Sequence, residues 1–235
     1  FHIDVNSAYL SWTSTENVRT GTGPDLRLLP AIIGGDQKNR HGVVLAKSIP
    51  AKAFGIVTGE PVATAFKKCP TLQMAAPDHH LYHAYSQRLM TLLESFCPYL
   101  EQLSIDECFL DMGRRGYRRE HAQALAEEIR AEVRKLGFTV NVGISSRKVL
   151  AKMASDFQKP DKTHTLFPEE IKEKMWPLPV GELYMAGHSS VTTLHMLGIL
   201  TIGDLARSDR SLIESHLKSH GTLLWEYANG IDDRP

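Results

Sequence analysis

Long apolar runs are missing from this sequence of 235 residues, since no stretch of 18 apolar residues occurs and no signal peptide precedes the first predicted strand. These absences argue against a transmembrane helix and a secreted protein, and they predict a soluble, cytoplasmic one. Cysteine is also scarce. Cys69, Cys97 and Cys108 are odd in number and lack CxxC spacing, which argues against a disulfide framework and predicts reduced thiols in or near the core.

An excess of either charge is the third absence. Lys+Arg and Asp+Glu are each 27, so the net charge is zero, whereas nucleic-acid-binding proteins usually carry a basic excess. Basic residues nevertheless gather in two places that could contact phosphate. For the first cluster, a solvated loop is the alternative to a phosphate clamp. The two clusters are Arg114, Arg115, Arg118 and Arg119, and then Arg147, Lys148, Lys152, Lys159 and Lys162. With 42% hydrophobic residues, the chain can form one to three compact units.

Two adjacent carboxylates interrupt an apolar run at Ser104-Ile105-Asp106-Glu107. Successive side chains of a regular strand point to opposite faces, so Asp106 and Glu107 would share a site only from a tight hairpin turn. Segments 99–103 and 108–112 would form the two strands of that hairpin. An unpaired buried carboxylate is costly unless a cation neutralises it, which suggests a metal site. A solvated acidic turn is the alternative.

The N-terminal segment supplies a third carboxylate. Residues 1–5 alternate as a strand, with Phe1, Ile3 and Val5 on one face, and Asn6 and Ser7 are good N-caps for a following helix. Asp4 therefore lies near the end of a strand that leads into a helix, where open α/β structures bind ligands.

Three clustered carboxylates would repel one another unless divalent cations neutralise them. Oxygen ligands select Mg²⁺ or Mn²⁺. Two such ions about 3.5–4 Å apart form the arrangement that activates an attacking hydroxyl and holds a leaving phosphate.

Three motifs together resemble a known family. They are Asp4-Val5-Asn6-Ser7-Ala8-Tyr9, Ser104-Ile105-Asp106-Glu107, and residues 141–155 (NVGISSRKVLAKMAS) followed by Lys159-Pro160. Their order and spacing resemble those of the Y-family translesion DNA polymerases, most closely the bacterial DNA polymerase IV branch. The resemblance runs over essentially the whole chain.

The resemblance implies an α+β fold with a ferredoxin-like palm formed by residues 1–11 and 75–164, a small fingers insertion at 12–74, and a helical thumb at 165–235 that contains a helix-hairpin-helix. Helical spacing at 122–136 with Gly137 as C-cap, alternation at 138–144, and a helix over 146–157 agree with the palm. Family members carry a further C-terminal domain, the little finger, which we expect to be absent from this chain.

The resemblance also implies the site residues. The metal ligands would be Asp4, the carbonyl of Val5, Asp106 and Glu107; the nucleotide contacts Ser7, Ala8, Tyr9, Lys47, Lys52 and Lys159; and the DNA contacts Arg40, Gly187 and His188. Tyr9 would be the steric gate that excludes a 2′-hydroxyl. Core packing for Tyr9, a solvated helix end for Lys159 and plain loop positions for Arg40 and His188 are the alternatives.

The triphosphate motif departs from the family's pattern, because Ile49 and Lys52 stand where most relatives have Tyr and Arg. Lysine neutralises phosphate as a point charge without the bidentate fork of arginine, and isoleucine donates no hydrogen bond. Lys47 or Ser48 would have to compensate.

The function that the resemblance implies is template-directed addition of deoxynucleotides to a primer 3′-hydroxyl in translesion synthesis. Two Mg²⁺ ions would take part, and Mn²⁺ would substitute for them. The partners would be primer-template DNA and dNTP, with a sliding clamp contacted through the missing C-terminal region, and the protein would be a monomer. A catalytically inactive DNA-binding paralogue and a nucleotidyl cyclase are the alternatives. The first class typically loses the metal carboxylates, which this sequence retains.

Overall fold

The structure is a computed structural model that describes residues 1–35 and 42–234. Its α-helices are α1 (Ala8–Thr20), α2 (Ile49–Ala53), α3 (Val62–Lys68), α4 (His79–Phe96), α5 (Arg119–Lys135), α6 (Lys148–Asp156), α7 (Ile171–Lys174), α8 (His188–Met196), α9 (Ile202–Arg207) and α10 (Arg210–Ala228). Short 3₁₀ turns are η1 (Leu26–Leu28), η3 (Pro168–Glu170) and η4 (Val180–Glu182). The strands are β1 (His2–Val5), β2 (Ala31–Gly34), β3 (Val44–Lys47), β4 (Gln73–Ala75), β5 (Leu100–Gln102), β6 (Glu107–Leu110), β7 (Val140–Ile144) and β8 (Thr163–Thr165).

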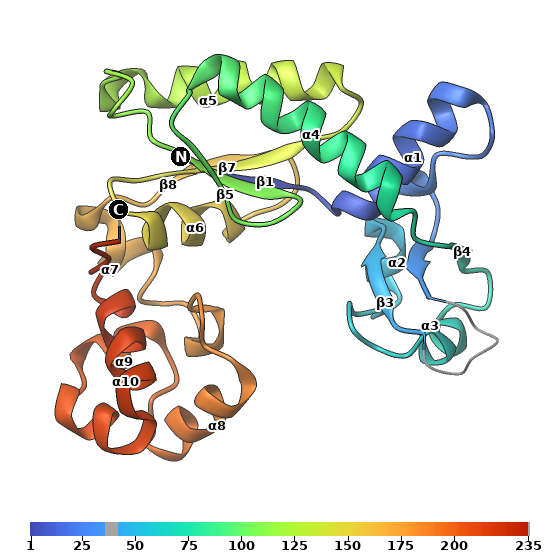
Figure 1. Cartoon of the computed structure of the whole chain (residues 1–235). Helices are drawn as coiled ribbons and strands as arrows, with labels where there is room; N and C mark the ends of the chain where they lie inside the picture. Colours follow the sequence, from blue (N-terminus) through green and yellow to red (C-terminus); the bar gives the residue numbers. More distant parts are fainter. Residues whose placement is uncertain (36–41, 235) are drawn as a thin grey trace. The chain divides into compact units, whose positions relative to one another are not determined.

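The strands form two sheets, one of five strands in the order β5-β6-β1-β7-β8 and one of three in the order β3-β2-β4 (Figure 1). By their internal contacts the residues divide into two compact units. Unit 1 comprises Phe1–Asp4, Cys108–Glu128 and Asn141–Pro235, and unit 2 comprises Val5–Glu107 and Ile129–Val140. The fold is therefore mixed α+β, as the sequence predicts.

In unit 2, the central strand β2 is buried on both faces. Ile32 packs with α2 and α3 in one cluster, whereas Ala31 and Ile33 pack with Leu10 of α1 in another. Successive side chains of a strand point to opposite faces, so each cluster takes alternate residues of β2. β3 pairs with β2 antiparallel and β4 pairs with it parallel.

An aromatic cluster joins α1 to α4 in the same unit. Trp12 is fully buried and its ring lies 6.0 Å from that of Tyr82 and 6.1 Å, edge-on, from that of Phe138. Aromatic pairs at such separations stabilise packing beyond the area they bury. The start of α1, which carries Tyr9, is therefore held against α4.

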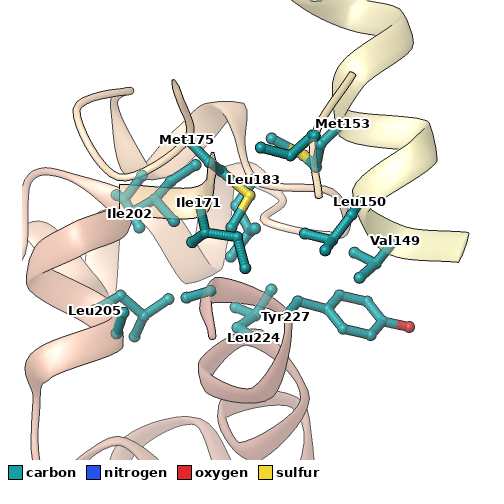
Figure 2. Packing of buried hydrophobic residues seen from close by; sticks show 14 of the residues in the cluster. Val149, Leu150, Met153, Ile171, Met175, Leu183, Ile202, Leu205, Leu224 and Tyr227 are labelled. Atoms are coloured by element: carbon teal, nitrogen blue, oxygen red, sulfur yellow. The ribbon is translucent and has the colours of Figure 1, made fainter. Parts of the chain in front are cut away.

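In unit 1, α6 packs very closely on β7. A Cβ added at Gly143 would lie 1.8 Å from the carbonyl oxygen of Ala151, so only glycine allows this approach. On its other side α6 contributes Val149, Leu150 and Met153 to the core formed with the C-terminal helices (Figure 2). Helices α8, α9 and α10 gather around that core (Figure 1).

Several sequence predictions are confirmed here. The helix predicted at 122–136 is α5, with Gly137 at φ 95°, and the helix predicted at 146–157 is α6. All three cysteines are free and buried. None of the helices within the described ranges is long and apolar enough to cross a membrane.

The strands predicted at 1–5 and 138–144 are confirmed as β1 and β7. Polar residues in them are buried too, since His2 is fully buried and every residue of β7 is buried. Both strands lie inside the five-stranded sheet, where polar residues are also covered. The short strand β8, which pairs parallel with β7, was not predicted.

Candidate active site

Asp4 occupies a nearly enclosed position in β1. Its side chain is only 15% exposed, and burial raises the pKa of this carboxyl above its usual value although the Lys159 ammonium opposes the shift. Lys159 donates to Oδ2 of Asp4. A buried carboxylate paired with a cation is the expected solution to its desolvation cost.

Lys159 follows α6 and contacts two carboxylates. Besides Asp4, its Nζ lies 2.8 Å from Oδ1 of Asp156, the last residue of α6. Burial disfavours the ammonium, but Asp4 and Asp156 outweigh burial and raise the pKa of Lys159. Lys159 therefore stays charged and lies on the Asp4 carboxylate. Its contact with the phosphates of a nucleotide stays a prediction.

The second part of the site is the turn between β5 and β6. Leu103 N–H donates to the carbonyl of Glu107 (3.0 Å), which closes the turn. The Ser104 hydroxyl donates to Oδ1 of Asp106 at 2.7 Å and so fixes one carboxylate oxygen. The predicted hairpin is confirmed, with Asp106 at the end of the turn and Glu107 as the first residue of β6.

Val5, the residue after Asp4, is hydrogen-bonded to the acidic turn. Its N–H donates to the carbonyl of Asp106 at 3.0 Å, so the backbone that follows Asp4 is paired with the acidic turn. Asp4 itself belongs to unit 1, and Asp106 and Glu107 to unit 2. Convergence of the three carboxylates on one site therefore stays a prediction. Within residues 1–35 and 42–234 no three His, Cys, Asp or Glu side chains form a ready metal-binding group.

The donor set still fits divalent cations. Asp4, Asp106, Glu107 and the Val5 carbonyl supply hard oxygen atoms, the type that Mg²⁺ and Mn²⁺ prefer. Asp4 already holds a cation, because the Lys159 ammonium lies on its carboxylate. A side chain that needs positive charge in this position suits a metal ligand.

The start of α1 differs from the capped helix end that the sequence suggested. Ser7 stands at the N-cap with left-handed backbone angles (φ 47°, ψ 54°) and makes no side-chain cap. Asn6 is buried, and its side-chain oxygen accepts from the Thr139 hydroxyl at 2.9 Å. The predicted helix start is therefore confirmed with Ser7 at the N-cap, but without a side-chain cap from Ser7. Ser7 is exposed and Ala8 is buried.

Tyr9 is partly exposed, so it is not simply a core residue. Its ring stacks on that of Tyr82 with centroids 4.3 Å apart and an interplanar angle of 8°. His79 meets the same ring edge-on at 6.0 Å. These partners were not predictable from the sequence, because α4 is more than 60 residues away along the chain.

Two lysines are close together at the end of β3 and in α2. Burial and the neighbouring Lys52 lower the pKa of Lys47, which donates to the Thr58 hydroxyl at 3.4 Å. No carboxylate within the described residues forms an ion pair with either lysine. The Glu60 carboxylate opposes this shift in the pKa of Lys47 only in part. Two neighbouring ammonium groups favour an anionic ligand.

Ser48 does not compensate for the departures at the triphosphate motif. Its buried hydroxyl donates to the Leu29 carbonyl at 2.6 Å and accepts from the N–H groups of Ala31 (3.0 Å) and Ala51 (3.1 Å). This hydroxyl is fully used in holding α2, so that suggestion was wrong. Ile49 is largely exposed.

Of the three predicted DNA contacts, the structure describes Gly187 and His188. Arg40 lies outside the described residues. Gly187 is the exposed N-cap of α8, and His188 is the first residue of that helix and is also exposed. Met185, two residues earlier, has a left-handed backbone with φ 71°.

Sequence reasoning missed the role of Asp156 and Ser104. The spacing between Asp156 and Lys159 is the i, i+3 separation at which charged side chains meet near a helix end, so this pair was detectable. The Ser104 contact depends on the conformation of the turn, which the sequence does not reveal.

Comparisons with known proteins agree with the resemblance seen in the sequence. The model of the impB/mucB/samB family matches residues 3–156. A protein named DNA polymerase IV from Clostridium acetobutylicum is 53% identical over 236 residues, which cover 99% of this chain and 59% of that protein. Another of that name, from Acetivibrio thermocellus, is 37% identical and is covered over 57% of its length. The chain thus spans less than two thirds of these relatives.

Solved structures show the same fold. A Y-family DNA polymerase chimera, Dbh-Dpo4(243-245)-Dbh, has a TM-score of 0.86 at 24% identity, with 100% of this chain and 68% of that chain covered. DinB from Sulfolobus solfataricus has a TM-score of 0.84 at 24% identity, with 99% and 67% covered. From its motifs and its match over residues 3–156, the chain belongs to the impB/mucB/samB family.

Proposed function

We propose that this protein is a template-directed DNA polymerase that adds deoxynucleotides to a primer 3′-hydroxyl during translesion synthesis. The observation that carries this proposal is the buried Asp4 carboxylate at the end of β1, neutralised by Lys159, in a chain that is 53% identical to a protein named DNA polymerase IV. Primer-template DNA and dNTP would be its substrates, and it would act as a monomer.

The proposed domains follow the sequence boundaries. Residues 1–11 and 75–164 would form a ferredoxin-like palm, residues 12–74 the fingers, and residues 165–235 a thumb with a helix-hairpin-helix. The fingers assignment is supported by the separate small sheet β3-β2-β4 and its own hydrophobic cluster. The thumb assignment is supported by helices α8 to α10, which share one hydrophobic core.

Asp4, the Val5 carbonyl, Asp106 and Glu107 would hold two divalent ions, Mg²⁺ with Mn²⁺ as a substitute. When bound, such ions lower the pKa of an attacking hydroxyl and neutralise phosphate charge. Ser104 orients the Asp106 carboxylate through its 2.7 Å hydrogen bond, which leaves the other oxygen, Oδ2, available.

Cationic side chains would bind the triphosphate. Lys159 would leave Asp4 and pair with a phosphate, while Lys47 and Lys52 supply two further positive charges from the fingers. The first N–H groups of α1, at Ser7 and Ala8, have no partner within that helix and would donate to phosphate oxygens. Tyr9 would lie beneath the sugar as the steric gate.

DNA would be held without sequence readout. The Gly187 N–H already donates to the Met185 carbonyl at 3.0 Å. The N–H groups that follow it at the start of α8, from His188 on, would therefore donate to a phosphate. A Cβ added at Gly187 would meet nothing within 4 Å, so the protein itself leaves open space there. Arg40 would contact the template from the fingers.

Primer extension tests the proposal. We expect the chain to extend a primed template with dNTP and Mg²⁺, and Asp106→Ala to abolish extension, because one ligand of both ions is lost. Glu94→Gln, which removes an exposed carboxylate of α4 in the same unit, is the matched control and should extend normally.

Failure of the parent chain to add any nucleotide would contradict the polymerase assignment and favour the inactive paralogue. Equal extension by Asp106→Ala would contradict the site. A cyclase would consume nucleotide without any template.

A further inference from the structure

The turn that carries Lys159 is held by a buried asparagine. Asn141 lies in β7 and is fully buried. Its amide nitrogen donates to the carbonyls of Ser155 (2.9 Å) and Gln158 (2.7 Å), and its oxygen accepts from the N–H of Lys162 (3.2 Å). These three bonds fix residues 155–162, the segment that contains both Asp156 and Lys159.

A polar side chain in this position needs an explanation, because the rest of β7 is apolar. Compared with an apolar residue, a buried amide adds little to the stability of the fold, because its hydrogen bonds within the protein only replace hydrogen bonds with water. The Asn141 side chain therefore suggests a role in fixing the segment that it contacts. Three hydrogen bonds of Asn141 go to this one segment. Gly143 makes this possible, because it allows β7 and α6 to touch through their backbones.

Asp156 contacts the side-chain ammonium of Lys159, whereas Asn141 fixes the backbone around it. Its carboxylate lies 2.8 Å from the Lys159 ammonium and is 55% exposed, whereas that of Asp4 is 15% exposed. An exposed carboxylate is well hydrated and gains little from a surface ion pair. The contact nevertheless gives Lys159 a second anionic partner besides Asp4.

We propose that Asn141 and Asp156 are positioning residues for Lys159. Asn141 fixes the backbone of the turn, and Asp156 retains the ammonium beside the site when Asp4 binds a metal ion and no longer pairs with it. A divalent ion on Asp4 repels the ammonium, which without Asp156 would turn into solvent. Lysine carries large rotamer freedom, so holding it in place lowers the entropy lost on binding phosphate. This inference rests on the proposed function of Lys159.

A double-mutant cycle tests it, with the variants Asp156→Asn, Lys159→Met and the two combined. We expect Asp156→Asn to raise the KM for dNTP about fivefold to tenfold with kcat nearly unchanged, because binding rather than the chemical step is affected. In the Lys159→Met background the same substitution should have no further effect. Glu173→Gln, which removes an exposed carboxylate from α7 in the same unit, should leave KM unchanged.

Asn141→Ser provides a second variant and should also raise KM with a small change in kcat. Mn²⁺ titration without nucleotide gives a readout independent of turnover. Lys159→Met should tighten Mn²⁺ binding, because the competing ammonium is gone. Asp156→Asn should weaken Mn²⁺ binding, because Lys159 then has only Asp4 as a carboxylate partner.

The outcomes separate this inference from the proposed function. If Lys159→Met raises KM but Asp156→Asn does not, or if Asp156→Asn has the same effect in both backgrounds, the positioning role is overturned while the nucleotide contact of Lys159 stands. If Lys159→Met leaves KM unchanged, the proposed role of Lys159 itself fails.

Discussion

The ring of Tyr9 lies flat on the ring of Tyr82, with centroids 4.3 Å apart and an angle of 8° between the planes. Tyr82 is buried in α4, and its hydroxyl lies 3.1 Å from that of Thr13, one turn further along α1. The Tyr9 ring is therefore held on one face and cannot rotate toward Tyr82. A ring held in one position would exclude the 2′-hydroxyl of a ribonucleotide better than a ring that rotates freely.

Replacing Tyr9 tests the steric-gate role. Tyr9→Ala removes the ring, so we expect the ratio of dNTP to rNTP incorporation efficiency to fall by at least about tenfold. Tyr9→Phe retains the ring and its stacking and should discriminate as the parent does. The measurement is single-nucleotide incorporation of matched dNTP and rNTP. Equal discrimination by Tyr9→Ala and the parent would show that Tyr9 is only a packing residue.

Local signals predicted a large part of the fold. Apolar spacing and Gly137 located α5, and the acidic pair located the turn between β5 and β6. Each of these depends on residues close together in sequence, where periodicity and turn chemistry act directly.

Contacts between distant segments were not predictable in the same way. Alternation located β1 and β7, but it did not show that the polar residues His2 and Asn141 are fully buried in them. Likewise Asn141 reads as one polar residue in a strand until its bonds to residues 155–162 are seen. In both cases the burial of a residue depends on segments far away along the chain, and the residues next to it in the sequence do not reveal it.

Met185 is a strained position before α8. Its backbone is left-handed (φ 71°) and its side chain is 49% exposed, so it loses little packing on truncation. Because a left-handed residue other than glycine costs about 1–2 kcal/mol, Met185→Gly should stabilise the protein by about 0.5 kcal/mol after the extra chain entropy of glycine is counted. Urea unfolding measures the change.

Met196 provides the matched control, since it is 75% exposed but lies in α8 itself. Met196→Gly should destabilise the protein by about 0.5 kcal/mol, less than glycine costs in a helix interior, because Met196 is the last residue of α8. The two substitutions are therefore expected to have opposite signs. A loss of stability in Met185→Gly would mean that the side chain contributes packing that outweighs the backbone strain.

A substitution at Gly187 can distinguish an effect on DNA binding from an effect on stability. It has an ordinary φ of −73° and open space around its Cβ position, so Gly187→Ala should leave the free energy of unfolding nearly unchanged. If a DNA phosphate approaches its backbone, the added methyl group obstructs it, and affinity for primer-template DNA should fall about threefold to tenfold. Fluorescence anisotropy at fixed salt measures this. Unchanged affinity would argue against a phosphate contact at Gly187.

The N-terminus of α6 is stabilised by a residue far along the chain. Arg147 at the N-cap makes no side-chain cap, and buried Asp232 takes its place, accepting from the Val149 N–H at 2.8 Å. Arg234 donates to both oxygens of Asp232 at 2.7 and 2.8 Å. Although burial disfavours this carboxylate, Arg234 and the Val149 N–H hold the pKa of Asp232 below its usual 3.8.

This arrangement predicts a stabilising contribution that depends on pH. Asp232→Ala should lower the free energy of unfolding by about 2 kcal/mol at pH 7, because both a helix cap and the partner of Arg234 are lost. The folded-state pKa lies below the unfolded one, so the contribution is complete above about pH 4 and is lost as the pH falls through the folded value. Urea unfolding at pH 7 and pH 3 should therefore show a smaller difference between parent and variant at pH 3.

Asp233→Ala, at the exposed neighbouring carboxylate, is the control and should change the free energy of unfolding much less at both pH values. A difference that stays constant with pH would mean that Asp232 stabilises α6 by packing and not by its charge.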